Sequence, residues 1–206
     1  MSRNNPYNIV EDFEAALCEY TGAPYAVTTN SCTMAIFLTC AWHRTLADNI
    51  KILEIPKRTY VSVPMSIIHA GYRVSFREEN WSGSYQLKPL PIYDSARRFS
   101  RNMYVPTQYQ CVSFHASKIL GHSQGGAILC DDSSANAWFR RARFDGRSKG
   151  VPPKDDYFNM LGWHCYMSPD VAAALLLKFY SLPDENKDLP NDSYPDLSTF
   201  RIFYDR

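Results

Sequence analysis

One lysine near the middle of the chain stands in a setting suited to covalent chemistry. Lys118 ends the segment Ser113-Phe114-His115-Ala116-Ser117-Lys118, which begins at the end of a predicted strand and precedes Gly125-Gly126. Apolar neighbours would partly desolvate its amine and favour the neutral form, which attacks aldehydes. Lys118 is therefore a candidate for a Schiff base, although a lysine after a strand is, taken alone, more often a surface residue.

Two further groups complement that amine. Asp94 ends a predicted strand 24 residues earlier, where it could cap the strand or keep a pyridinium nitrogen protonated. Ser31, Cys32 and Thr33 open a predicted helix. Two uses fit them, a simple helix cap or a phosphate site built from free N–H groups and a hydroxyl, to which Ser113 could add a second hydroxyl. An amine, a carboxylate and a phosphate site are what pyridoxal 5'-phosphate (PLP) needs from a protein, so we expect this cofactor.

The elements that must position these groups alternate along the chain. The pattern predicts helices over 12–20, 33–44, 61–70, 135–143 and 169–180, strands over 25–27, 51–55, 72–76, 91–93, 111–114 and 127–129, and a loop over 77–91. This alternation indicates an α/β fold with a mostly parallel sheet flanked by helices. Ligands of such sheets bind at the carboxyl ends of the strands, where Asp94 and Lys118 would lie.

Composition restricts the class of protein. The length of 206 residues suits one well-buried domain, and a net charge of +1 gives no case for binding nucleic acid or an anionic membrane. We see no signal peptide and no membrane span, which favours a cytoplasmic protein. The six cysteines are scattered without close pairs, so we expect buried free thiols and no metal site.

Several segments resemble the motifs of the DegT/DnrJ/EryC1/StrS family of PLP-dependent sugar aminotransferases. The resemblance spans most of residues 8–180, and its most specific part is the segment around Lys118. Residues 30–36 are similar to the family pattern N-S-G-T-x-A-L, and residues 56–61 to P-x-x-T-[FWY]-V. Residues 94–96 are similar to D-x-A, and residues 113–118 with 125–126 to S-F-H-x-x-K…GG. Residues 162–168 are similar to G-Y-N-Y-R-M-S.

The resemblance implies the large domain of the fold type I aminotransferases and a homodimer with shared active sites. It implies that Lys118 and Asp94 are catalytic and that Tyr60 stacks on the cofactor. Arg97 stands where the family has Gln or His, and His164 stands where the family's Asn reaches the partner's cofactor phosphate. The other implied cofactor-binding residues are those already named at the helix start and at Ser113.

The sequence also departs from the family. Cys32 replaces the phosphate-turn glycine, and the loop over 77–91 is short, as if a strand and a helix were missing. The chain has about half the usual family length. We therefore expect a reduced PLP-binding large domain over 1–182 and a weakly structured C-terminal tail or arm over 183–206, without a complete small domain.

These features lead to one preferred function and two alternatives. The preferred one is a PLP-dependent aminotransferase that moves an amino group from glutamate to a nucleotide-linked keto-sugar through a Lys118 Schiff base. Arg97, Arg98 or Arg101 could meet a substrate carboxylate or phosphate, or could form a solvated face. The alternatives are PLP chemistry on a sugar without net transamination, which the presence of Lys118 disfavours, and a non-catalytic dimeric module or partner subunit.

Overall fold

A computed structural model describes residues 5–47, 49–191 and 194–204. Five strands form one sheet in the order β1-β7-β6-β5-β4, and β2 and β3 form a separate pair. The strands are β1 (Tyr25–Thr29), β2 (Ile52–Pro56), β3 (Arg73–Arg77), β4 (Tyr85–Leu87), β5 (Ile92–Asp94), β6 (Tyr109–Ser113) and β7 (Gly126–Cys130). The α-helices are α1 (Asn8–Thr21), α2 (Cys32–Leu46), α3 (Ser62–His69), α4 (Ser133–Ala142) and α5 (Pro169–Phe179).

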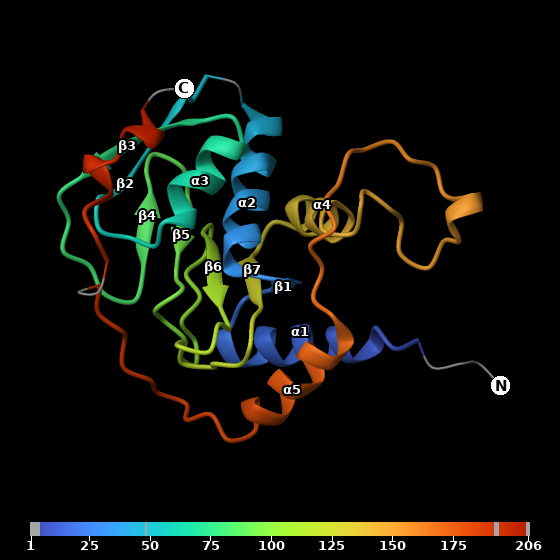
Figure 1. Cartoon of the computed structure of the whole chain (residues 1–206). Helices are drawn as coiled ribbons and strands as arrows, with labels where there is room; N and C mark the ends of the chain where they lie inside the picture. Colours follow the sequence, from blue (N-terminus) through green and yellow to red (C-terminus); the bar gives the residue numbers. More distant parts are fainter. Residues whose placement is uncertain (1–4, 48, 192–193, 205–206) are drawn as a thin grey trace.

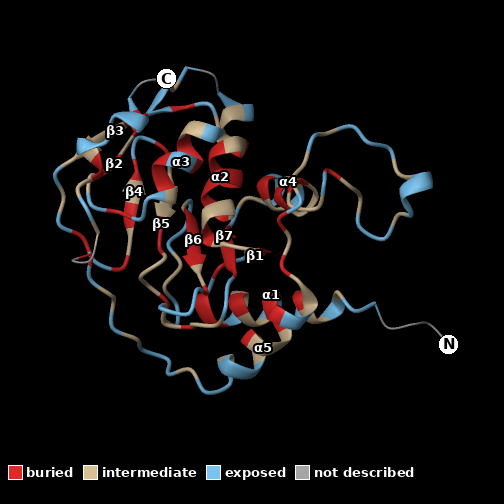
Figure 2. Cartoon of the chain, viewed as in Figure 1, coloured by how far each residue is buried: buried red, intermediate tan, exposed pale blue. Residues whose placement is uncertain are grey.

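Helices cover both faces of the larger sheet (Figure 1). On one face Ala127 and Leu129 of β7 pack in a cluster with residues of α1 and α5; on the other, Ile128 and Cys130 pack in a cluster with residues of α2 and α4. Alternate residues of β7 thus enter two cores, which explains why its sequence is continuously apolar. Figure 2 shows the buried residues concentrated in the sheet and on the inner sides of α1 and α2.

The sheet is mixed and mostly antiparallel, so the predicted mostly parallel sheet is wrong. β1 with β7, β6 with β7, and β4 with β5 are antiparallel, whereas β5 with β6 and β2 with β3 are parallel. The link between β4 and β5, residues 88–91, suits a hairpin and is too short for a parallel crossover. The predicted loop over 77–91 contains β4, which is too short to show a periodic pattern.

The predicted helices are found with modest shifts at their ends. The Ser31 hydroxyl caps α2 by accepting a hydrogen bond of 3.3 Å from the backbone N–H of Met34. Gly22 ends α1 in the left-handed region at φ 78°, where glycine is favoured. α5 begins at Pro169 as predicted, but the Ser168 side chain makes no cap hydrogen bond.

The C-terminal segment, expected to be weakly structured, binds back onto the body of the protein. We call residues 183–191 and 194–204 the C-terminal strap. The hydroxyl of Tyr20 donates a 2.6 Å hydrogen bond to the carbonyl of Pro183 at its start. Leu197, near its end, is 2% exposed, and its N–H donates to the carbonyl of Lys57. In Figure 1 the strap runs from α5 past β4 to β2 and β3.

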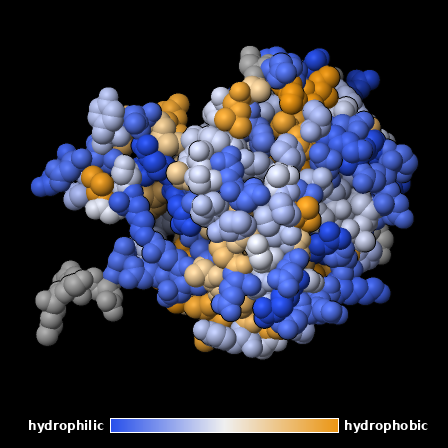
Figure 3. Space-filling view, turned by 180° about the vertical axis from the view of Figure 1, so that it is seen from behind, coloured by the Kyte–Doolittle hydropathy of each residue, from blue (hydrophilic) through white to orange (hydrophobic). Residues whose placement is uncertain are grey.

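A second long segment, residues 144–166, projects from the end of α4, and we call it the arm (Figures 1 and 3). Its two ends lie side by side, since Phe144 and His164 form an antiparallel bridge. Tyr157, Phe158 and Leu161 expose 81%, 60% and 89% of their surface on it. In the part of the chain that the structure describes, no helix has the length and apolar character needed to cross a membrane.

Candidate active site

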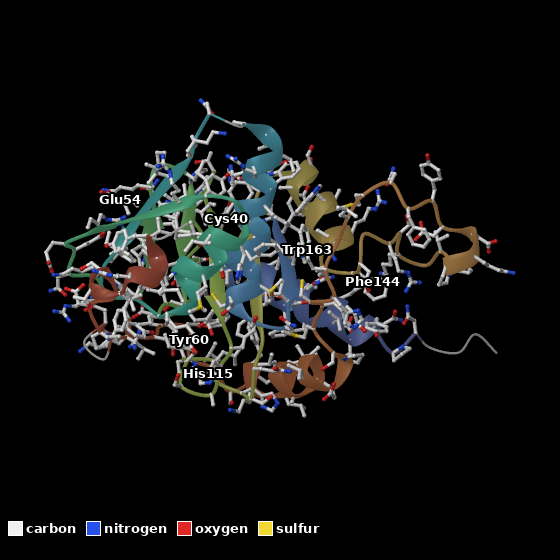
Figure 4. The ribbon with its side chains drawn as sticks, turned by 45° about the horizontal axis from the view of Figure 1, so that its top comes forward. Cys40, Glu54, Tyr60, His115, Phe144 and Trp163 are labelled. Atoms are coloured by element: carbon white, nitrogen blue, oxygen red, sulfur yellow. The ribbon has the colours of Figure 1, made fainter. Side chains whose placement is uncertain are left out.

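A cavity of about 430 Å³ lies where β5 and β6 end, beside the start of α2. Because β5 and β6 are parallel, their last residues, Asp94 and Ser113, emerge at the same edge of the sheet. The volume lies within the range of small-ligand sites. Eight of the nine predicted site residues line this cavity: Ser31, Cys32, Thr33, Tyr60, Asp94, Arg97, Ser113 and Lys118. Figure 4 shows Tyr60 and His115, another lining residue, at this end of the molecule.

Lys118 stands in the tight turn that follows β6. Its backbone N–H donates a 2.8 Å hydrogen bond to the carbonyl of His115, and the buried Phe114 and Leu120 flank the turn. The side chain is half-buried, and its Nζ donates to the hydroxyl of Tyr194 at 3.5 Å. The amine therefore lines the cavity from a turn anchored by the packing of Phe114 and Leu120.

Asp94 is a buried carboxylate, with only 4% of its surface exposed. Burial raises its pKa above the ordinary value, and this outweighs hydrogen bonds from the Ala96 N–H and the Tyr85 hydroxyl and the positive charges of Lys118 and Arg97. The ionised form of a buried carboxylate with a raised pKa would be stabilised by a further cationic donor inside the cavity. A protonated pyridine nitrogen is such a donor, so the residue fits the ring of PLP.

The start of α2 supplies the end of the cavity that suits an anion. The helix N-terminus carries free N–H groups and a partial positive charge. Gly126 lets β7 approach closely here, since a Cβ on it would lie 2.4 Å from the backbone nitrogen of Cys32. The Cys32 thiol donates to the carbonyl of Cys111 and points into the core, so Cys32 offers its backbone rather than its side chain. The Thr33 hydroxyl lies 2.7 Å from that of Ser62.

The predicted set omits several residues that line the cavity, among them Ser62, Trp81 and Tyr194. Ser62 follows the predicted aromatic position by two residues, and its hydroxyl joins that of Thr33. Trp81 lies in the segment that we predicted to be a loop, where a lone tryptophan in a polar stretch was the available signal. Tyr194 comes from the C-terminal strap, 76 residues beyond Lys118, and no local pattern marks it.

Two arginines that we considered for substrate binding are engaged elsewhere. Arg98 forms an ion pair of 2.6 Å with Asp188, and Arg101 forms one of 2.6 Å with Asp184. Both acids belong to the strap, so these arginines hold the strap rather than face the cavity. Arg97 alone of the three lines the cavity, with its Nε 3.1 Å from the hydroxyl of Tyr194.

His164 lies outside the cavity of its own chain. It is on the arm, its side chain is 71% exposed, and its Nδ1 lies 2.9 Å from the Asp145 carboxylate. Figure 4 places Phe144 and Trp163, at the base of the arm, well away from Tyr60 and His115. A role for His164 in the site of a partner subunit stays a prediction. Among the described residues, no group of three or more His, Cys, Asp or Glu could hold a metal ion.

Comparison with known proteins identifies a family and a fold. The model of the DegT/DnrJ/EryC1/StrS aminotransferase family matches residues 3–92 and 106–188. An aminotransferase of Helicobacter pylori involved in the biosynthesis of pseudoaminic acid is similar at a TM-score of 0.71 and 17% identity, covering 84% of this chain and 57% of that chain. No curated protein matches the sequence.

Two other solved structures share the fold. A DegT/DnrJ/EryC1/StrS aminotransferase from Brucella abortus has a TM-score of 0.69 at 19% identity, covering 86% of this chain and 59% of that chain. A sugar aminotransferase from Micromonospora echinospora has a TM-score of 0.67 at 16% identity, covering 87% and 61%. At these identities the likeness shows the fold, and the chain spans about three fifths of the length of these proteins.

Proposed function

This chain belongs to the DegT/DnrJ/EryC1/StrS aminotransferase family, and on that premise we propose that it is a PLP-dependent aminotransferase that transfers an amino group from glutamate to a nucleotide-linked keto-sugar. The observation that carries the proposal is the meeting of Lys118, Asp94 and the start of α2 in one cavity. An amine, a buried carboxylate and an anion site are the three groups that PLP requires.

Each part of the cavity has a place in this proposal. Lys118 would hold the cofactor aldehyde through its amine, and Asp94 would face the ring nitrogen. Ser31, Thr33 and the first N–H groups of α2 would hold the phosphate. Tyr60, which is 56% exposed at the rim, would cover the ring. PLP, when bound, supplies a ring that accepts electrons from the substrate carbon.

The residues of the chain would contribute orientation and proton transfer. The Lys118 amine is the one basic group in the proposed set that can take a proton from a substrate carbon and return it to another. The Asp94 carboxylate would keep the ring nitrogen protonated, because the buried charge is best neutralised by that proton. The guanidinium of Arg97 would offer a planar pair of donors to a carboxylate or phosphate.

We also propose that the protein is a homodimer whose cavity is completed across the interface. The arm projects from the body and exposes Tyr157, Phe158 and Leu161, which supports contact with a second copy (Figure 3). In a two-fold symmetric dimer each arm would extend toward the other subunit, and His164, which lies on the arm, would be placed near the partner.

Visible absorbance tests the proposed reaction. The purified protein, mixed with PLP, should develop a visible band, and glutamate should bleach it as the amino group moves to the cofactor. Lys118→Ala should prevent the band, whereas Lys149→Ala, which changes a lysine of the arm, should leave it intact. A band that glutamate does not bleach would contradict the proposed transfer.

One observation favours a second candidate function. The chain spans 57% to 61% of the length of the compared structures, so the activity of those whole proteins is only a proposal for it. The alternative is a non-catalytic PLP-binding module or a partner subunit that acts with another protein. It predicts a stable band with PLP and no bleaching with glutamate, which the same experiment detects.

A further inference from the structure

The strap places a tyrosine inside the candidate active site. The hydroxyl oxygen of Tyr194 accepts hydrogen bonds from Lys118 Nζ at 3.5 Å and from Arg97 Nε at 3.1 Å. The guanidinium of Arg97 also lies over the Tyr194 ring, 4.6 Å from its centroid. Tyr194 thus contacts both cationic residues that line the cavity.

Aromatic residues fix the ring of Tyr194 from two other sides. The ring is nearly parallel to that of Trp81, with an interplanar angle of 16° and centroids 6.2 Å apart. It meets Tyr60 edge-on, with centroids 6.3 Å apart. Such contacts hold a ring in one orientation and add to its burial. The position of the hydroxyl is therefore set by packing as well as by its hydrogen bonds.

The strap is anchored on both sides of Tyr194. Before it, Asp188 pairs with Arg98, and the N–H of Leu189 donates to the carbonyl of Arg97 at 2.9 Å. After it, Asp196 pairs with Lys57 at 2.8 Å. Gly83 allows close passage of the strap, because a Cβ there would lie 2.2 Å from the Asp188 carboxylate. These contacts on both sides of Tyr194 fix its position at the cavity.

We propose that Tyr194 is a positioning residue of the cofactor site, supplied by the strap as a wall of the cavity. The inference rests on the proposed function. Its oxygen receives hydrogen bonds from Lys118 and Arg97, so it orients the amine that would hold PLP and the guanidinium beside it. Its own O–H is then available to an oxygen of the cofactor or substrate.

Conservative variants test this role through cofactor binding and through the spectrum. Tyr194→Phe keeps the ring between Trp81 and Arg97 and removes only the hydroxyl. We expect it to weaken PLP affinity by about 3- to 10-fold, the effect of one net hydrogen bond. It should also change the visible band of the loaded protein, because the nitrogen of Lys118 loses a hydrogen-bond acceptor. Tyr194→Ala, which also removes the wall, should weaken binding further.

Tyr204→Phe is the matched control. It removes a hydroxyl from the same strap, one that donates to the carbonyl of Ser198 at 3.1 Å outside the cavity, and it should leave the affinity and the visible band unchanged. An unchanged band and affinity in Tyr194→Phe would overturn the role of Tyr194 alone. Tighter PLP binding by either Tyr194 variant would also overturn it, since the phenol would then compete with the cofactor. A parent protein that forms no band would overturn the proposed function and this role together.

Discussion

The hydroxyl of Tyr85 donates a 2.8 Å hydrogen bond to the buried carboxylate of Asp94. Tyr85 in turn lies 2.5 Å from the hydroxyl of Thr59, which must be the donor of that pair, so three side chains form a chain of hydrogen bonds beneath the cavity. This chain fixes the carboxylate in one orientation. It also stabilises the ionised form of a group whose pKa burial raises.

Tyr85→Phe should therefore destabilise the protein and raise the pKa of Asp94 further. We expect a loss of roughly 1–2 kcal/mol in the free energy of unfolding, measured by urea denaturation, because two buried polar partners lose a hydrogen bond. PLP affinity should fall as well. Tyr93→Phe, on the same strand pair but half-buried, is the control; an equal loss in both variants would show that the Tyr85 hydroxyl has no special part.

Lys118 should be the residue that carries PLP. Borohydride reduction of the loaded protein, followed by peptide mass mapping, should place the pyridoxyl group there. The turn after β6 holds this amine in the cavity, whereas Lys57 and Lys149 are paired with carboxylates at the surface. Label on another lysine, despite tight PLP binding, would disprove the assignment.

Asp94→Asn should fold but turn over far more slowly. An amide cannot keep the ring nitrogen protonated, and the charge-assisted hydrogen bond that is lost is worth roughly 1.5–3 kcal/mol. Half-reaction rates with glutamate should fall by at least an order of magnitude, as followed by stopped-flow absorbance. Rates equal to those of the parent would reduce Asp94 to a residue that caps a strand end.

From the projecting arm we predict a dimer with shared active sites. Light scattering should give about twice the chain mass of 23.6 kDa. His164→Ala should weaken PLP binding by about 1–2 kcal/mol, the value of one hydrogen bond to a phosphate, because its side chain lies outside its own cavity and can act only across an interface. A monomer that binds PLP equally well with and without His164 would refute the shared site.

Glu14 should make stability depend on pH. Burial alone would raise its pKa, but the charges of Arg143 and Arg140 and a hydrogen bond from the Thr28 N–H outweigh this and lower it below 4.5. A lowered pKa in the folded state stabilises the protein above the unfolded pKa, and this stability is lost as the pH falls through the folded pKa. The free energy of unfolding should therefore fall as the pH drops below about 4.5.

Two matched variants compare the buried ion pair of Glu14 and Arg143 with an ion pair at the surface. Glu14→Gln should cost roughly 3–5 kcal/mol near neutral pH, since it leaves Arg143 without its buried counter-charge, and should flatten the acid limb of the stability curve. Glu11→Gln, which removes a half-exposed partner of Lys149 on the same helix, should cost about 1 kcal/mol or less. Urea denaturation at several pH values measures both.

Local signals were enough to locate three features that meet at the cavity, and their roles there stay predictions. The cap at Ser31, the strand end at Asp94 and the turn at Lys118 each depend on a few neighbouring residues, and the structure brings all three to one cavity. Short-range hydrogen bonds and turn geometry decide such features, so the sequence contains them directly.

Contacts between residues far apart in the sequence could not be predicted from local sequence patterns. The antiparallel partner of β1 is β7, about a hundred residues away, and nothing in either strand specifies that direction. Tyr194 is a tyrosine in a proline-containing segment, and its place depends on ion pairs from that segment to Arg98 and Lys57 in the first half of the chain. Tertiary contacts of this kind follow from the whole fold rather than from local preference.

The pairs that hold the strap separate charge within a chain whose net charge is only +1. Asp184, Asp188 and Asp196 lie on the strap, and Arg101, Arg98 and Lys57 lie on the body. These pairs lie at the partly exposed surface, where dissolved ions screen attraction over about 8 Å at physiological ionic strength. Higher ionic strength would therefore loosen the wall of the cavity that Tyr194 forms and leave the buried floor at Asp94 in place. Access to the site would then increase with salt concentration.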